Sequence, residues 1–249
     1  MAIKLIANTV WQNAANIVTH NASNFTDLVD TGTLNLVGGP RHLGYSSIDT
    51  ALRRISYLNS AATLTADTFI LCGANNHSAK AVNLLSWTNS STSASIVAHA
   101  SFAESLIGPN FQDWVYEFST LSSKYAFTLE FATTAYTKLA TKAIFGTALS
   151  FANPASAVYA PLWETHKAGR NEYLVEYEAE WIFQNVSRTD AQTLERTYGK
   201  MTEPVFFYDS TGYVIPDKLW HGIITELNIA PAFDNVHDVL IRSKRLRHY

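Results

Sequence analysis

The sequence predicts a mainly β protein: an antiparallel β-sandwich followed by a small α+β domain with one helix. Three observations support this fold class. Short apolar runs separated by polar turns recur over residues 67–150, which is typical of a sandwich. An alternating apolar and charged pattern begins the region from residue 171. A capped helical pattern and further strand patterns follow it to the end of the chain.

Residues 1–66 are the least regular part of the sequence. Gly38-Gly39-Pro40 is a turn signal. Apolar residues between Ile48 and Leu58 have helical spacing, but Arg53–Leu58 also partly alternates, so a helix and a strand both stay open. The segment is too apolar for a solvated tail. We expect it to be an interaction arm that contacts a neighbouring subunit, or else a part that completes the sandwich.

Residues 67–150 are expected to form the sandwich domain. The predicted strands are Phe69–Cys72, Val82–Trp87, Trp114–Ser119, Tyr125–Phe131 and Lys142–Phe145. The alternation within these strands predicts the core residues Phe69, Leu71, Leu84, Tyr116, Phe127 and Leu129.

A boundary is expected at Asn153-Pro154-Ala155, with residues 151–170 as a linker and residues 171–249 as the C-terminal α+β domain. Its first strand, Tyr173–Phe183, carries apolar residues at odd positions and glutamates at even ones. We therefore expect one buried face, which includes Val175, Tyr177 and Trp181. Glu176, Glu178 and Glu180 are expected on the wetter or interfacial face.

A helix is predicted directly after this strand. Ser187 stands at its N-cap, with Asp190 three residues later as in a capping box. Ala191, Leu194 and Tyr198 share one face, and Gly199 suits the C-terminal end. Strands are then expected at Val205–Tyr208, Trp220–Ile229 and Val236–Leu246.

Charge and cysteine content narrow the choice of partners. Charged residues make up only 16% of the chain, against a usual figure of about 25%, which favours a surface covered by neighbouring subunits. The net charge of −3 argues against a nucleic-acid partner. The basic residues near the C-terminus form a solvated tail or a strand edge protected by charge, or else they contact an acidic surface of another subunit; they are Arg242, Lys244, Arg245 and Arg247. The one cysteine, Cys72, is expected in the core.

No targeting segment or membrane span is expected. The N-terminus lacks the apolar stretch of a signal peptide. No run reaches the roughly 18–20 apolar residues of a membrane helix. The chain is therefore expected to be made in the cytoplasm.

No catalytic, cofactor-binding or metal-binding residue is predicted. Known catalytic motifs are absent, and the histidines are scattered without metal-ligand spacing. Two weaker patterns suggest alternatives. Glu176, Glu178 and Glu180 lie about 6–7 Å apart on a strand, within the range of a glycan hydrolase. His77 with Trp87 and Trp114 would suit a sugar-binding cluster.

The order of these features resembles phage tail-associated proteins that carry a discoidin-like, galactose-binding-like β-sandwich and a small C-terminal domain. The resemblance rests on Phe69–His77, on the aromatic pair Trp114–Phe118 and Tyr125–Phe131, and on Glu203–Asp209 and Leu219–Gly222. It covers about residues 67–247.

The resemblance implies a structural, non-enzymatic virion subunit in the tail tip, baseplate or another tail-associated layer. Its partners would be other tail proteins and copies of itself in a ring-like homo-oligomer. No cofactor, nucleic acid or membrane is expected. The first alternative is a carbohydrate-binding module whose partner is a surface glycan, and the second is a glycan hydrolase.

Overall fold

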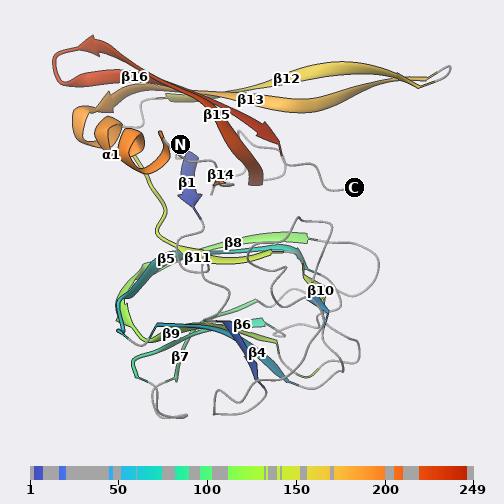
Figure 1. Cartoon of the computed structure of the whole chain (residues 1–249), viewed down its shortest axis with the longest axis vertical. Helices are drawn as coiled ribbons and strands as arrows, with labels where there is room; N and C mark the ends of the chain where they lie inside the picture. The colour runs from blue at the N-terminus through green and yellow to red at the C-terminus, as the bar shows by residue number, and fades with distance from the viewer. Residues whose placement is uncertain are drawn as a thin grey trace. The chain divides into compact units, whose positions relative to one another are not determined.

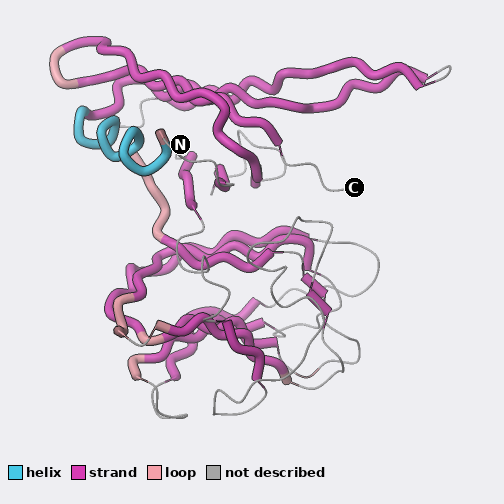
Figure 2. Tube along the Cα trace, viewed as in Figure 1, coloured by secondary structure: helices cyan, strands magenta, loops and turns pink. Residues whose placement is uncertain are grey.

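The structure of the chain is a computed structural model. It describes the following residues: 3–7, 17–20, 45–46, 52–59, 61–74, 82–89, 96–102, 112–131, 133, 139–140, 142–151, 156–168, 171–199, 205–209 and 219–245. These residues form two compact units. The sandwich unit consists of residues 8–147 and 248–249, and the C-terminal unit consists of Met1–Ala7 and Ala148–Arg247. Strands dominate both units (Figures 1 and 2).

The sandwich unit contains two main antiparallel sheets (Figure 1). A five-stranded sheet has the order β2-β4-β9-β6-β7, and a three-stranded sheet has the order β11-β5-β8. Their strands are β2 (Ile17–His20), β4 (Arg53–Leu58), β5 (Leu64–Ala74), β6 (Val82–Trp87), β7 (Ile96–Phe102), β8 (Gln112–Lys124), β9 (Ala126–Phe131) and β11 (Lys142–Gly146). The short strands β3 (Tyr45–Ser46) and β10 (Leu139–Ala140) pair separately.

The core of this unit lies between the two sheets. Phe69, Leu71, Leu84, Phe127 and Leu129 are buried there, as their alternation predicted. Phe127 stacks on Phe145, with ring centroids 5.2 Å apart. The expected sandwich is therefore confirmed.

Tyr116 differs from the prediction because it is only partly buried against this core. It lies on β8, which pairs with β5 alone among the described strands. A residue on such an edge strand has described neighbours on one side only.

The C-terminal unit contains a six-stranded antiparallel sheet and the helix α1 (Figure 1). The strand order is β1-β14-β15-β16-β13-β12. The strands are β1 (Ile3–Ala7), β12 (Ser156–Ala168), β13 (Asn171–Ser187), β14 (Val205–Asp209), β15 (Leu219–Phe233) and β16 (Val236–Arg245). The expected fold class, an antiparallel β-sandwich together with an α+β domain, is confirmed, and α1 is the one helix among the described residues.

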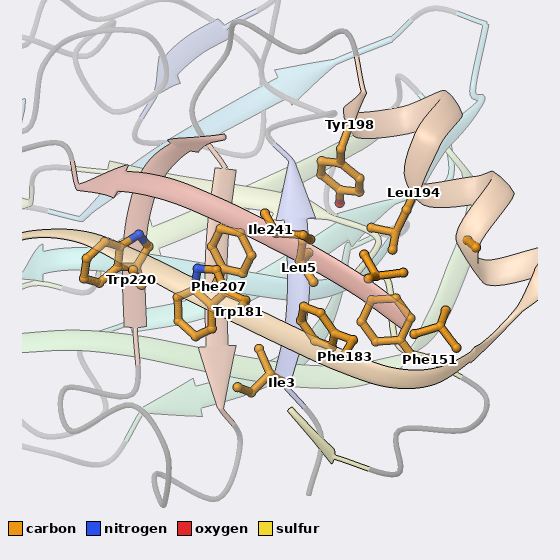
Figure 3. Packing of buried hydrophobic residues seen from close by; sticks show 14 residues of the cluster. Ile3, Leu5, Phe151, Trp181, Phe183, Leu194, Tyr198, Phe207, Trp220 and Ile241 are labelled. Carbon is orange, nitrogen blue, oxygen red and sulfur yellow. The ribbon is translucent and has the colours of Figure 1, made fainter. Parts of the chain in front are cut away.

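Aromatic rings fill the core of this unit (Figure 3). Trp181 on β13 is fully buried and stacks on Phe207, with ring centroids 4.5 Å apart. Its indole N–H donates a hydrogen bond to Ser243 Oγ at 3.1 Å. The predicted burial of Trp181 is confirmed, while the side chains of Val175 and Tyr177 lie outside the described residues.

Helix α1 spans Arg188–Tyr198 and follows β13 without a break. Ser187 Oγ accepts a hydrogen bond from the backbone N–H of Asp190 at 3.1 Å, so the predicted N-cap is confirmed. The helix packs on the sheet through Ala191, Leu194 and Tyr198, the face that its spacing predicted.

Burial of Tyr198 predicts a loss of stability at high pH. Desolvation raises the pKa of its phenol well above the ordinary value of 10.0, so only the unfolded chain ionises it readily. Keeping the Tyr198 phenol protonated therefore favours the folded state. This contribution to the free energy of unfolding is complete below pH 10, and it is lost as the pH rises towards the pKa of the phenol in the folded state. We expect the free energy of unfolding to fall less between pH 9 and 11 in Tyr198→Phe than in the wild type. Equal slopes in urea titrations would contradict this.

The structure divides the chain at other positions than the sequence predicted. Residues 151–170 are not a linker, because Ser156–Ala168 forms β12. Residues 1–66 are not one segment: Ile3–Ala7 pairs with β14 in the C-terminal unit, whereas Arg53–Leu58 pairs with β9 in the sandwich unit. Arg53–Leu58 is thus a strand. Strand pairing between distant parts of the sequence decides both assignments.

Candidate functional site

One glutamate of β13, Glu180, belongs to a network of ion pairs. Arg242 on β16 donates hydrogen bonds to Glu180 Oε2 at 3.0 Å and to Glu226 Oε2 at 2.8 Å. The hydrogen bond with Glu180, together with the nearby charge of Glu226, raises the pKa of the guanidinium. Glu178 and Glu180 are partly exposed, in keeping with the predicted wetter face, and the side chain of Glu176 lies outside the described residues. The network links the three adjacent strands β15, β16 and β13, and it gives Glu180 a charged partner within the sheet.

Trp87 is not available as a member of the predicted sugar-binding cluster. Its side chain is fully buried, and its indole N–H donates a hydrogen bond to Thr128 Oγ1 at 2.7 Å. It therefore cannot serve as an exposed platform, and this prediction is wrong for Trp87. His77 and the side chain of Trp114 lie outside the described residues.

The C-terminal basic residues have separate roles where they are described. Arg242 is held by the two glutamates. Arg245 lies over the ring of Trp220, with its guanidinium carbon 5.2 Å from the ring centroid, which is a cation–π contact. Arg247 lies outside the described residues.

A shallow hollow opens along β8 in the sandwich unit. Its volume is about 630 Å³, and it is lined by Tyr116, Glu117, Phe118, Ser119 and Leu121. The rings of Tyr116 and Phe118 are stacked, with centroids 6.1 Å apart. Partly exposed aromatic rings beside a carboxylate can bind an apolar face and a hydroxyl group together.

The hairpin of β12 and β13 extends beyond the rest of its sheet (Figure 1). The pairing of β13 with β16 begins at Glu178, whereas its pairing with β12 continues to Asn171. From Trp163↔Glu176 to Ala168↔Asn171 the two strands therefore pair only with each other among the described residues. We call residues 163–176 the hairpin extension. Its length is about 20 Å.

The outer edge of this sheet carries features of a protected edge strand. β12 contains Pro161, which lacks a backbone donor and is tolerated in strands mainly at edges. The register shifts between Leu162 and Trp163, where the hairpin leaves the rest of the sheet. Proline and bulges both hinder further strand pairing.

Within the described part of the chain, no helix is both long and apolar enough to cross a membrane. In the same residues, no three histidine, cysteine, aspartate or glutamate side chains group as metal ligands would.

Comparison with known proteins gives matches to solved structures alone. No family model matches the chain, and no curated protein matches it. Chitosan-binding module 1 from a Paenibacillus sp. IK-5 chitosanase/glucanase is 9% identical, with 52% of this chain and 92% of that chain covered and a TM-score of 0.40. CBM32-1 from a Clostridium perfringens family 31 glycoside hydrolase is 12% identical, with 53% and 94% covered and a TM-score of 0.37.

A third match comprises the CBM32-1 and CBM32-2 domains of Clostridium perfringens ZmpB in complex with GalNAc. It is 8% identical, covers 58% of this chain and 35% of that chain, and has a TM-score of 0.40. The structural neighbours thus include carbohydrate-binding modules.

Proposed function

We propose that this chain is a non-enzymatic assembly protein that joins a larger particle through the hairpin extension. The particle, following the sequence resemblance, is a bacteriophage tail. The observation that carries the proposal is that, among the residues the structure describes, 163–168 and 171–176 pair only with each other. An isolated two-stranded hairpin is marginally stable in water. A binding partner that covers the extension would supply the missing packing.

Two further features support assembly over catalysis. The charged fraction of 16% is low for a free domain. Glu180, one of the three glutamates that would carry acid–base chemistry, is engaged by Arg242 in an ion pair on the sheet surface. Contacts with other subunits, including copies of itself, would then cover surface that a free domain would keep charged.

The test is to replace residues 163–177 with Asn-Gly, which closes the hairpin at the Leu162↔Glu178 pair with a two-residue turn. We expect the shortened chain to keep its circular dichroism spectrum but to be missing from purified virions by mass spectrometry. Glu226→Gln, on the same sheet but away from the extension, should be incorporated like the wild type. Normal incorporation of the shortened chain would show that the extension is not the contact. A wild-type chain absent from virions would rule out the tail assignment.

A second candidate function is glycan binding at the hollow along β8. The observation that favours it is the stacked pair of Tyr116 and Phe118 beside Glu117. Sugars present an apolar ring face and hydroxyl groups, and an aromatic platform with a nearby acceptor can bind both. This function is compatible with assembly, because a tail subunit of this kind would attach the particle to a cell surface.

Chitosan oligomers and GalNAc are suitable first probes, because one compared structure is a chitosan-binding module and another is a complex with GalNAc. On a glycan array we expect binding that falls about tenfold or more in Phe118→Ala, by loss of one stacked ring (roughly 1.5 kcal/mol). Thr120→Ala, at an exposed position of the same strand, is the matched control. If no glycan on the array binds the wild-type chain, the second candidate function is contradicted.

A further inference from the structure

The turn between β15 and β16 is held in place by helix α1. The strands end at Phe233 and Val236, and Asp234 and Asn235 form the turn. Asn235 has a φ of 59°, in the left-handed region. Its carbonyl oxygen accepts a hydrogen bond from the backbone N–H of Arg188 at 3.0 Å. The first residue of α1 therefore fixes the position of this hairpin tip, which is residues 231–237.

Phe233 projects from this fixed tip into solvent. Among the described residues it is the large apolar side chain left exposed, at 79%. Burial of a phenylalanine side chain is worth roughly 1.5–3 kcal/mol. An exposed ring on a fixed turn is therefore available to bind a partner at little cost in ordering the backbone.

A hollow of about 480 Å³ lies directly beside the ring. It is lined mainly by Arg188, Pro231, Phe233, Asp234, Val236 and His237. His237 Nδ1 is buried and has no hydrogen-bond partner within the described part of the chain. The hollow has room for an aromatic ring, and its wall includes apolar surface from Pro231 and Val236.

The protruding ring of Phe233 and the hollow lie on one patch of the surface. In a two-fold interface the same patch meets itself, so each copy must carry both halves of the contact. The exposed side chains of Arg188 and Asp234 add opposite charges to the same patch. A two-fold axis through the patch can place the Arg188 of one copy opposite the Asp234 of the other. A patch with this composition is complementary to itself.

We propose that the hairpin tip binds a second copy of this chain, with Phe233 of each copy seated in the hollow of the other. The proposal rests on the assembly function above and deepens it by naming one partner. The contact is small, so the isolated chains should dimerise weakly and the particle should strengthen the contact through its other interfaces.

Sedimentation equilibrium over a range of concentrations tests the contact on the full chain. We expect a monomer–dimer equilibrium in the wild type, and a dissociation constant about 30-fold or more higher in Phe233→Ala, as for an interface hot spot. Asn228→Ala, at an exposed position of the same hairpin, should leave the constant unchanged. Equal constants for the wild type and Phe233→Ala would overturn the proposal.

Charge reversal tests the two-fold geometry. Arg188→Asp and Asp234→Arg should each weaken the dimer, and the double variant should restore it, because every copy then carries the reversed pair. Both single changes are compatible with folding: the positions are exposed, and an aspartate suits the first turn of a helix. A double variant weaker than either single one would overturn the two-fold arrangement.

One outcome separates this proposal from the function it rests on. A wild type that stays monomeric, while Phe233→Ala is lost from purified virions, overturns the second copy as partner and assigns the tip to a different subunit. The shortened hairpin extension should leave the dimerisation constant unchanged, because residues 163–177 are not in the tip. Dimerisation lost with the extension would likewise overturn the assignment to the tip.

Discussion

Replacing Trp181 with alanine is expected to lower the free energy of unfolding of the C-terminal unit by about 4 kcal/mol. The side chain is fully buried and touches three partners: it stacks on Phe207, meets the Trp220 ring edge-on at 6.0 Å, and donates to Ser243 Oγ. The substitution removes the ring contacts and leaves a cavity. It also leaves the buried Ser243 hydroxyl without this donor.

The measurement must isolate the C-terminal unit, because two units need not unfold together. Amide hydrogen exchange in β13 and β16 reports on this unit directly. Trp181→Phe is the matched control: it keeps a ring against Phe207 and should cost about 1–2 kcal/mol. A loss below 1 kcal/mol for Trp181→Ala would show that the faces of β13 are assigned the wrong way round.

Replacing Glu130 with alanine is expected to destabilise the sandwich unit by roughly 3 kcal/mol. Glu130 lies on the central strand β9, where Arg54 Nε donates to its Oε2 at 2.7 Å and Asn83 Nδ2 donates to its Oε1 at 2.8 Å. The side chains of Arg54 and Glu130 are only 17% and 11% exposed. Without the carboxylate, the guanidinium would stay largely buried without this counter-charge.

The double variant Arg54→Met with Glu130→Leu separates charge from packing. Because it removes both charges and keeps similar volume, it should recover most of the stability that Glu130→Ala loses. The readout is hydrogen exchange in β4 and β9. If the double variant were as unstable as the single one, the ion pair would not be the reason for the loss.

Sequence patterns predict the elements that depend on residues close together in the sequence. The alternation of β13 over residues 178–183 and the N-cap of α1 depend on residues close in sequence, and both predictions are confirmed. Strand β12 was missed because Asn153-Pro154 precedes it and Pro161 interrupts it, and proline normally argues against a strand. The proline is tolerated here because β12 lies at the edge of the sheet.

Long-range pairing could not be predicted from one sequence. Leu5 pairs with Phe207, and nothing in the short segment Ile3–Ala7 indicates that partner. Thr128 and Glu130 occupy the polar positions of β9 but are buried, because Ser56 and Arg54 on the neighbouring β4 meet them. Alternation along a strand predicts which face of the sheet a residue is on. It does not predict whether a polar side chain of a neighbouring strand pairs with that residue and buries it.

The candidate sites had weaker signals in the sequence. Asp234 and Asn235 are turn residues that directly follow Phe233, a pattern that indicates an aromatic ring at a hairpin tip. The strand predicted from the sequence, Trp220–Ile229, ends before this turn, so the prediction does not place Phe233 at a hairpin tip. The hairpin extension has no signal of its own, because it is defined by where the pairing of β16 with β13 stops.

The pairing of Ile3–Ala7 with β14 makes the sandwich unit an insertion within the C-terminal unit. The two ends of the inserted stretch adjoin, since Leu5 and Leu149 exchange backbone hydrogen bonds of 3.1 and 2.7 Å. During synthesis, the inserted stretch leaves the ribosome before the strands that receive β1, so the sandwich can fold first. The same proximity allows residues 8–147 to be exchanged for a short loop, which would make the C-terminal unit a scaffold for other inserted domains.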